Sequence, residues 1–242
     1  MFKNDRNKSK RSLWILDENF WEMVGWAIGD GSYCDKTNRF RLYGSVNEYS
    51  ILERFRLYLL SYIDVPEIKK QGKNVFALEV CSKSLNYVIE KVVGRLDRSC
   101  KVIPDMVWSE SYRNRVAFLR GLFSSDGSCK VKRDTGTSRI RYVSTSKLLV
   151  QELQVLLNSF GYDCSYGVNG TGNRKDGYTW NQAYQLSIRG TYNNRFYDEV
   201  GFLDNKSNDF CYVSENTDRT SVYETITDIE ILGEKVCCGA LS

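Results

Sequence analysis

Hydrophobic and polar positions along the chain form two kinds of pattern, and each kind occurs twice in the same order. Residues 20–29 and 117–125 are apolar on nearly every side of a helix, which is typical of a helix buried in a core. Residues 39–45 and 139–145 alternate between polar and apolar, which is typical of a strand with one face on the core. These patterns predict a chain built from two similar halves.

The repeat extends well beyond these patterns. In chain order, residues 20–32 match 117–128, 39–45 match 139–145, 76–80 match 184–188, and 93–97 match 200–204. Such self-similarity is the signature of a duplicated structural unit. Matches in the same order throughout are hard to attribute to chance.

Each repeat predicts the same series of elements. A helix ends at an Asp-Gly pair, where glycine suits the left-handed conformation that often follows a helix, and an amphipathic strand comes next. Further elements are predicted as helices at about 48–63 and 146–160, strands near 74–82 and 183–189, and last helices near 83–94 and 191–201. The predicted fold class is α+β, with two pseudo-symmetric αββαββα halves. Residues 167–177 are expected to form a long turn between strands.

Residue types that the chain lacks exclude several kinds of site. It has no histidine, which excludes a Ser-His-Asp triad, a Cys-His nucleophile pair and histidine-ligated metal centres. Its 8 cysteines include no CxxC pair, which favours reduced thiols in a reducing compartment. We see no signal-peptide pattern and no apolar run of membrane-spanning length, so we expect a cytoplasmic, organellar or nucleoid protein that is not secreted. Any hydrolysis must use carboxylates, metal ions and lysine.

The net charge of +4 is small but unevenly distributed. Residues 1–12 and residues 129–142 each carry five basic residues and one acidic residue, so the remaining chain is net acidic. A local basic patch on a nearly neutral protein suits contact with phosphates. A basic N-terminal tail is also common as a solubilising extension.

The two buried helices carry small residues at matching positions. Gly25 and Gly29 share one helix face, as do Gly121 and Ser125. Small residues at this spacing let two helix backbones approach closely. We therefore expect the helices to pair across a pseudo-two-fold axis, with their C-terminal ends side by side.

An aspartate stands at each of those ends, Asp30 in the first half and Asp126 in the second. Two facing carboxylates at the negative ends of two helix dipoles repel each other. Mg²⁺ relieves this repulsion, because it accepts carboxylate and phosphate oxygens together. One Asp-Gly pair would favour an ordinary capped core helix; two in equivalent places favour a phosphodiesterase site.

These segments carry a family resemblance. Residues 23–31, MVGWAIGDG, and 119–127, LRGLFSSDG, resemble the two signature motifs of the LAGLIDADG endonucleases. The resemblance covers about residues 18–212. The earlier acidic position of the motif is Ile28 in one copy and Ser124 in the other, while the family's chemistry rests on the final acid. The resemblance implies a homing endonuclease that makes a metal-dependent double-strand break, with short 3′ overhangs, in a long asymmetric DNA target.

The resemblance assigns the metal site to particular residues. Asp30 and Asp126 would bind the catalytic metal ions, with Mg²⁺ as the default and Mn²⁺ as the alternative. Gly29 and Ser125, which directly precede them, are also candidate metal-binding positions. The number of metal ions stays open.

Two lysines complete the implied catalytic site. Lys101, in the Lys-x-Ile-Pro segment 101–104, resembles a family lysine that organises water and steadies the phosphate. Lys206 is its counterpart by repeat position. Without the resemblance, either lysine would be taken for an ordinary solvated surface residue.

Two antiparallel sheets, one from each half, would form a saddle on double-stranded DNA. Arg39 and Arg41, and likewise Arg139 and Arg141, alternate onto one strand face, from which they could reach guanine edges or phosphates. The further DNA-binding candidates are Tyr43, Lys130, Lys132, Arg133, Asn169, Asn173, Arg174, Lys175, Gln185 and Arg189. The alternative is an ordinary exposed sheet face. Because the halves differ in sequence, we expect a monomer.

The predicted boundaries are a basic tail at 1–17, an N-terminal half at 18–105, a C-terminal half at 106–212 and an extension at 213–242. Residues 223–236 resemble the strand that leads into the C-terminal splicing segment of an intein. The chain lacks a terminal His-Asn pair, so self-splicing is not expected. A free-standing enzyme, or a relative of endonucleases embedded in inteins, is the better interpretation.

Two other functions on the same fold stay open. One is an RNA maturase that helps an intron RNA to fold, and the other is a DNA-binding protein whose catalysis has decayed. Retention of Asp30, Asp126 and Lys101 argues against decay. The sequence has no feature that separates a maturase from a nuclease.

Overall fold

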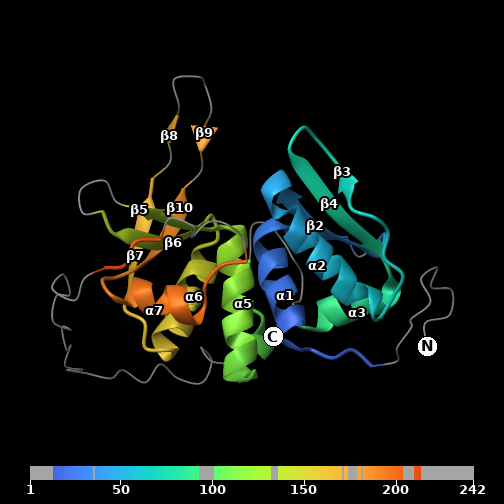
Figure 1. Ribbon diagram of the computed structural model, residues 1–242, viewed down its shortest axis with the longest axis horizontal. Coiled ribbons are helices and arrows are strands. Elements are labelled where there is room, and N and C mark those ends of the chain that lie inside the picture. The colour runs from blue at the N-terminus through green and yellow to red at the C-terminus, as the bar shows by residue number, and fades with distance from the viewer. Residues whose placement is uncertain are drawn as a thin grey trace, which may run out of the picture.

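The computed structural model describes residues 13–34, 36–92, 101–131, 136–170, 172–173, 179–180, 182–203 and 210–213. Two halves of mixed α/β structure lie on either side of a central pair of helices, α1 (Glu18–Asp30) and α5 (Tyr112–Ser125) (Figure 1). The predicted α+β class and two-half architecture are confirmed.

The two halves share one series of helices and strands, to which the second half adds α4, β8 and β9. After α1, the first half contains β1 (Gly31–Cys34), β2 (Arg39–Ser45), a 3₁₀ turn (Val46–Glu48), α2 (Tyr49–Leu60), β3 (Lys69–Lys70), β4 (Val75–Cys81) and α3 (Lys83–Val92). The second half contains α4 (Asp105–Ser109), α5, β5 (Gly127–Val131), β6 (Ser138–Ser144), α6 (Lys147–Ser159), β7 (Cys164–Asn169), β8 (Gly172–Asn173), β9 (Thr179–Trp180), β10 (Ala183–Ile188) and α7 (Tyr192–Glu199).

Each half contains an antiparallel four-stranded sheet with equivalent strand order. The first sheet runs β1-β2-β4-β3 and the second β5-β6-β10-β7. Arg41 pairs with Glu79 in the first sheet, and Arg141 pairs with Ser187 in the second. The cross-strand neighbours of the two arginines therefore stand at equivalent positions of the two sheets.

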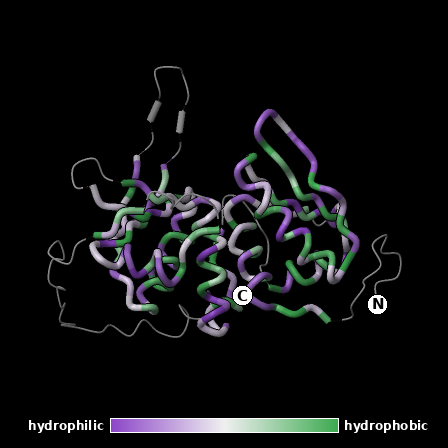
Figure 2. Tube along the Cα trace, viewed as in Figure 1, coloured by the Kyte–Doolittle hydropathy of each residue, from purple (hydrophilic) through white to green (hydrophobic). Residues whose placement is uncertain are grey.

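One face of each sheet covers the hydrophobic core. Phe40 and Leu42 of β2 are fully buried, as are Ile140 and Tyr142 of β6, so the predicted alternation is confirmed. Apolar segments run through the body of both halves, where helices pack against the sheets (Figure 2). Among the described residues, no helix is both long and apolar enough to cross a membrane.

The central helices touch backbone to backbone at their small residues. A methyl group built on Gly25 would lie 2.2 Å from the carbonyl oxygen of Phe118, and one on Gly121 would lie 2.0 Å from that of Glu22. Real side-chain carbons do not approach other atoms so closely, because the atoms would overlap. A close-packed interior leaves no room for the added methyl group. The predicted close approach is confirmed, and glycine is required on both sides.

The conformation expected after these helices is wrong. Gly31 is extended, with φ −112° and ψ 164°, and strand β1 begins at that residue. Its methyl group would lie 2.3 Å from the carbonyl oxygen of Ala27, and one on Gly127 equally close to that of Phe123. Glycine is needed here because the chain folds back against the last helical turn, and a left-handed backbone is absent at Gly31.

The turn predicted at residues 167–177 is also wrong in part. Strand β7 continues to Asn169, and beyond it Gly172 and Asn173 pair with Trp180 and Thr179. The two strands therefore extend the β7–β10 hairpin as an arm above the sheet (Figure 1). The glycines and polar residues of this segment indicated a loop, whereas hairpin pairing overrides local composition.

Candidate functional site

The C-terminal ends of α1 and α5 meet between the two halves. Asp30 is the last residue of α1, and Asp126 caps the end of α5. A methyl group on Gly29 would lie 2.0 Å from Ser125 Oγ and 3.3 Å from Asp126 Cγ, so the two ends are in direct contact. Both aspartates line one cleft of about 410 Å³. The side-by-side aspartates expected from the sequence are present.

Lys101 bridges the two helix ends. Its Nζ donates a hydrogen bond to the Gly29 carbonyl at 2.9 Å and lies 3.8 Å from Asp126 Oδ2. The lysine backbone is held from α6, because Ser146 Oγ donates to the Lys101 carbonyl at 2.6 Å. Two residues farther on, the Ile103 amide donates to Glu152 Oε2 at 2.7 Å. A cation on a fixed backbone therefore contacts the motifs of both halves.

Lys206 lies outside the described residues, but the chain leading toward it is anchored. The Leu203 amide donates to Ser124 Oγ at 2.7 Å, and that hydroxyl donates to the Arg120 carbonyl at 2.6 Å. The serine in the motif's earlier acidic position thus fixes the segment after α7 to α5. This role explains a small hydroxyl residue at a buried position of the helix.

The donor set fits a hard divalent cation. Two carboxylates stand at the negative ends of two helices, where a cation is favourable. Among the described residues, no group of three or more His, Cys, Asp and Glu side chains could hold a metal ion. A pair of carboxylates suits Mg²⁺, which keeps several water ligands and takes further oxygens from a phosphate. The Ser125 hydroxyl is engaged within its helix, where it donates to the Leu122 carbonyl at 2.8 Å.

Tyr142 lies beneath this site and was not among the sequence candidates. It is fully buried and pairs with Gly127, directly after Asp126. Burial raises the pKa of its hydroxyl well above the ordinary value, and the charges of Asp126 and Asp30 raise that pKa further. Its hydroxyl has no hydrogen-bond partner among the described residues. The repeat aligns Tyr142 with Leu42, so the halves differ at this position.

A buried carboxylate joins the two halves farther back along the helices, away from the aspartates. Glu22 of α1 is only 4% exposed, and it accepts hydrogen bonds from Arg54 and from Arg120 Nη1, the latter at 2.8 Å. Arg120 also donates to the Val200 carbonyl at 2.6 Å. A glutamate in an otherwise apolar helix was a signal for this network, since buried charges need partners.

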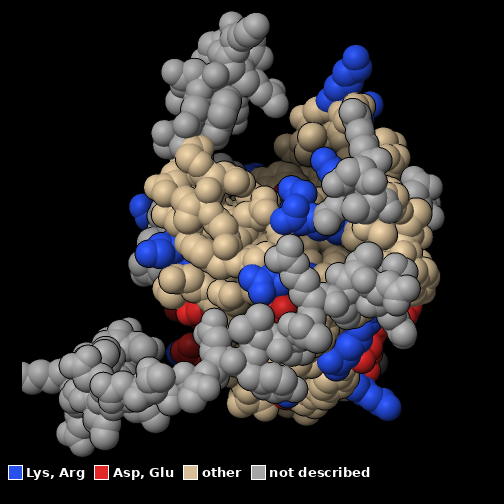
Figure 3. Space-filling view, turned by 90° about the vertical axis from the view of Figure 1, so that its left-hand side faces the viewer, with Lys and Arg blue, Asp and Glu red and all other residues tan. Residues whose placement is uncertain are grey.

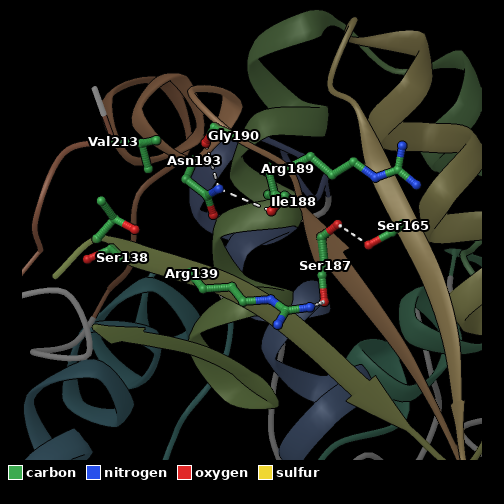
Figure 4. A pocket seen from close by; sticks show the side chains of 10 residues that line it. Ser138, Arg139, Ser165, Ser187, Ile188, Arg189, Gly190, Asn193 and Val213 are labelled. Carbon is green, nitrogen blue, oxygen red and sulfur yellow. Dashed lines mark hydrogen bonds between the residues drawn. The ribbon is translucent and has the colours of Figure 1, made fainter. Parts of the chain in front are cut away.

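The predicted arginines lie on the outer faces of the sheets, but their surroundings differ. Arg39 and Arg41 both form ion pairs with Glu79 of β4. Arg139 instead donates a hydrogen bond to Ser187 Oγ at 3.1 Å, across a hollow at the end of the second sheet (Figure 4). Glu79 was not among the sequence candidates, although the repeat already aligned it with Ser187.

Basic side chains predominate on the side of the molecule where the sheets lie. In the upper part of Figure 3, on the side of the sheets in Figure 1, the charged side chains are mostly Lys and Arg, while acidic ones lie lower. Lys130 of β5 is exposed and stands opposite Arg139. Arg189 is half-exposed, and its Nη1 lies 3.4 Å from Asp163 Oδ1.

The other sequence candidates are divided between the cleft, the sheet and undescribed segments. Tyr43 lines the cleft with the two aspartates, and its carbonyl accepts from Trp26 Nε1 at 2.9 Å. Gln185 donates to Ser187 Oγ at 2.9 Å, and Asn169 ends β7. The remaining candidates lie outside the residues whose side chains are described, namely Lys132, Arg133, Asn173, Arg174 and Lys175.

The second half of the chain matches a known family model. Residues 113–201 match the LAGLIDADG-like domain. The chain is 26% identical over 193 residues to a DNA polymerase of Thermococcus litoralis, covering 76% of this chain and 11% of that protein. It is 28% identical over 171 residues to a glutamine–fructose-6-phosphate aminotransferase of Methanocaldococcus jannaschii, covering 69% and 14%. The chain thus spans only a small part of these relatives.

Solved structures share the arrangement of both halves. A variant of I-DmoI in complex with its target DNA and manganese matches with a TM-score of 0.54 at 17% identity, over 77% of this chain and 94% of that one. The homing endonuclease I-WcaI bound to its DNA recognition sequence matches with a TM-score of 0.54 at 16% identity, over 85% and 91%. The chain therefore has the fold of the LAGLIDADG homing endonucleases, and its second half matches the model of a LAGLIDADG-like domain.

Proposed function

We propose that this protein is a site-specific endonuclease that uses divalent metal ions to break both strands of a long asymmetric DNA target. The observation that carries the proposal is the junction of the two motif helices. There Asp30, Asp126 and Lys101, which come from different parts of the chain, line one cleft. A buried helix pair has no structural need for two carboxylates at touching negative ends.

The two aspartates would hold Mg²⁺ or Mn²⁺. Such an ion, when bound, lowers the pKa of its water and stabilises negative charge on a phosphate. Lys101 would hold a positive charge beside the scissile phosphate, since its Nζ is fixed by the Gly29 carbonyl and Asp126. Lys206 is proposed as the equivalent lysine of the second half, on repeat position alone.

The outer sheet faces would bind the duplex on both sides of the cleft. Two solved proteins of the same fold are bound to target DNA, one of them in the presence of manganese, which supports DNA and a divalent cation as ligands. The halves present different side chains at equivalent strand positions. We therefore propose a monomer that reads a target whose two half-sites differ.

The relatives suggest how the chain arose. Similar segments occupy 11% of a DNA polymerase, 14% of an aminotransferase and 17% of an ATP-dependent helicase. These enzymes share no reaction, so a common segment within them favours an inserted element. We propose that the chain belongs to a mobile element of the intein or intron kind.

The decisive experiment is selection of cleaved duplexes from a randomised library. Purified protein with Mg²⁺ is expected to cut one long asymmetric sequence, and EDTA is expected to abolish cutting. Asp30→Asn and Asp126→Asn should each reduce the rate at least about 100-fold, because even the outer partners of metal ligands contribute 10–100-fold. Specific binding without cutting would overturn the nuclease proposal in favour of a DNA-binding protein, and binding to intron RNA alone would favour a maturase.

A further inference from the structure

The two sheets place arginine pairs at equivalent positions beside different neighbours. In the first sheet Arg41 stands opposite Glu79, and in the second Arg141 stands opposite Ser187. The strands of the second sheet contain no acidic residue at all, and those of the first contain only Glu79. The outer arginine pair is therefore partly neutralised in the first sheet and keeps its full charge in the second.

Glu79 holds Arg41 in a defined orientation. The Nε of Arg41 donates to Glu79 Oε2, and Arg39 Nε lies 3.6 Å from the other carboxylate oxygen. The hydrogen bond to Glu79 raises the pKa of Arg41, and a guanidinium is charged at neutral pH in any case. A guanidinium bound through Nε still has its terminal nitrogens for an acceptor pair such as guanine O6 and N7.

Stability does not account for this contact. The side chains of Arg41 and Glu79 are 30% and 29% exposed, and ion pairs that reach solvent stabilise a fold by only about 0–1 kcal/mol. A carboxylate on a surface that meets phosphates also weakens general binding to nucleic acid, because it cancels one positive charge. A group that weakens affinity and adds little stability has a role only if it sharpens discrimination between sequences.

We infer that Glu79 determines sequence specificity: it fixes Arg41 for base recognition in one half-site, while Arg139, Arg141 and Lys130 of the second sheet supply sequence-independent attraction to phosphates in the other. This inference rests on the proposed function, since it requires duplex DNA on the outer sheet faces. Glu79 can act in two ways on a base edge. It orients Arg41 toward guanine, and its free oxygen lone pairs can accept from the amino group of cytosine.

The pseudo-symmetry of the chain offers a reciprocal exchange as the test. Glu79→Ser places opposite Arg41 the residue type that stands opposite Arg141. Ser187→Glu makes the reverse change and places a glutamate opposite Arg141. Glu79→Gln keeps the side-chain length and removes the charge, and Ser187→Ala is the control for side-chain loss. All variants are the full chain, and binding to a randomised duplex library is measured in EDTA, where no strand is cut.

Glu79→Ser is expected to lower the preference at one or two base pairs of one half-site about tenfold. It should also steepen the dependence of log affinity on log salt by about one unit, because one more cation meets phosphate. Ser187→Glu should make that slope shallower by about one unit, and Ser187→Ala should leave it unchanged. Glu79→Gln should change the base preference and the salt slope in the same way as Glu79→Ser. This agreement separates the effect of charge from any effect on folding.

The outcomes separate this inference from the proposed function. Wild-type protein that selects a duplex sequence, while Glu79→Ser and Glu79→Gln keep its base preferences and salt slope, would overturn the role of Glu79 alone. Wild-type protein without affinity for any duplex would overturn both proposals. A shift in base preference confined to one half-site on Glu79 substitution, and to the other on Ser187→Glu, is the result that supports the inference.

Discussion

At the helix interface the two halves obey the same constraint, and at the sheet surfaces they do not. Gly25 and Gly121 each lie against a carbonyl oxygen of the opposite helix, so neither position tolerates a methyl group. On the sheets, by contrast, the equivalent positions opposite Arg41 and Arg141 hold Glu79 and Ser187. Backbone contact leaves no freedom to diverge, whereas the part-exposed Glu79 is free to take up a function of one half only, and its buried counterpart Ser187 is not.

The largest expected effect is on stability, at the two glycines of the helix interface. Gly25→Ala and Gly121→Ala should each lower the free energy of unfolding by about 3 kcal/mol, because added methyl groups would overlap backbone atoms at 2.2 and 2.0 Å. Denaturation by urea measures this change. Gly167→Ala is the control, since nothing lies within 4 Å of its methyl group. A mild effect at one glycine and a severe effect at the other would break the equivalence of the halves.

The next effect concerns the lysines. Lys101→Met should reduce the rate of DNA cleavage on the order of 100-fold while leaving affinity for DNA nearly unchanged, because the charge beside the reacting phosphate is lost. Single-turnover kinetics on the selected target measure the rate, and Lys91→Met, an exposed lysine of α3, is the control. Lys206→Met should match Lys101→Met if the pseudo-symmetry extends to this pair. A much smaller loss of cleavage rate in Lys206→Met would mean that only the first half supplies a catalytic lysine.

The smallest effect lies at Tyr142, where the other half has leucine. Tyr142→Phe should raise the free energy of unfolding by about 1 kcal/mol, because it removes a buried hydroxyl that has no described partner. Tyr162→Phe should have the opposite effect, since that hydroxyl donates to Glu199 Oε2 at 2.7 Å. Thermal or urea unfolding compares the two. A loss of stability in Tyr142→Phe would mean that this hydroxyl has a partner at the cleft.

The sequence predicted the parts of the molecule that backbone packing determines. The repeat, the buried helices and the aspartates at their ends followed from apolar pattern and small-residue spacing, because these features are local along the chain. The alternation of Arg39 to Tyr43 with Phe40 and Leu42 predicted the two sheet faces for the same reason. Lys101 was found only through the family resemblance, since a lone lysine carries no local signal.

The parts that the sequence missed depend on pairing between distant strands. The ion pair of Arg41 with Glu79 requires the register of β2 on β4, and the hairpin arm beyond Asn169 requires the pairing of β8 with β9. The repeat had aligned Glu79 with Ser187, yet only the register placed both beside arginines. A left-handed backbone was predicted for Gly31 because glycine often takes that conformation after a helix. Close contact with the last helical turn instead requires glycine there, in an extended conformation.

The most direct test of the central claim resolves the two DNA strands. One site, built from both motifs, is expected to cut both strands, because the helix ends that carry Asp30 and Asp126 are in contact and Lys101 touches both. The selected target, labelled on each strand in turn, is incubated with Mg²⁺ and with Asp30→Asn or Asp126→Asn. Each variant is expected to lose cleavage of both strands at least about 100-fold while still binding the target. A variant that cuts one strand at the wild-type rate would contradict a shared site.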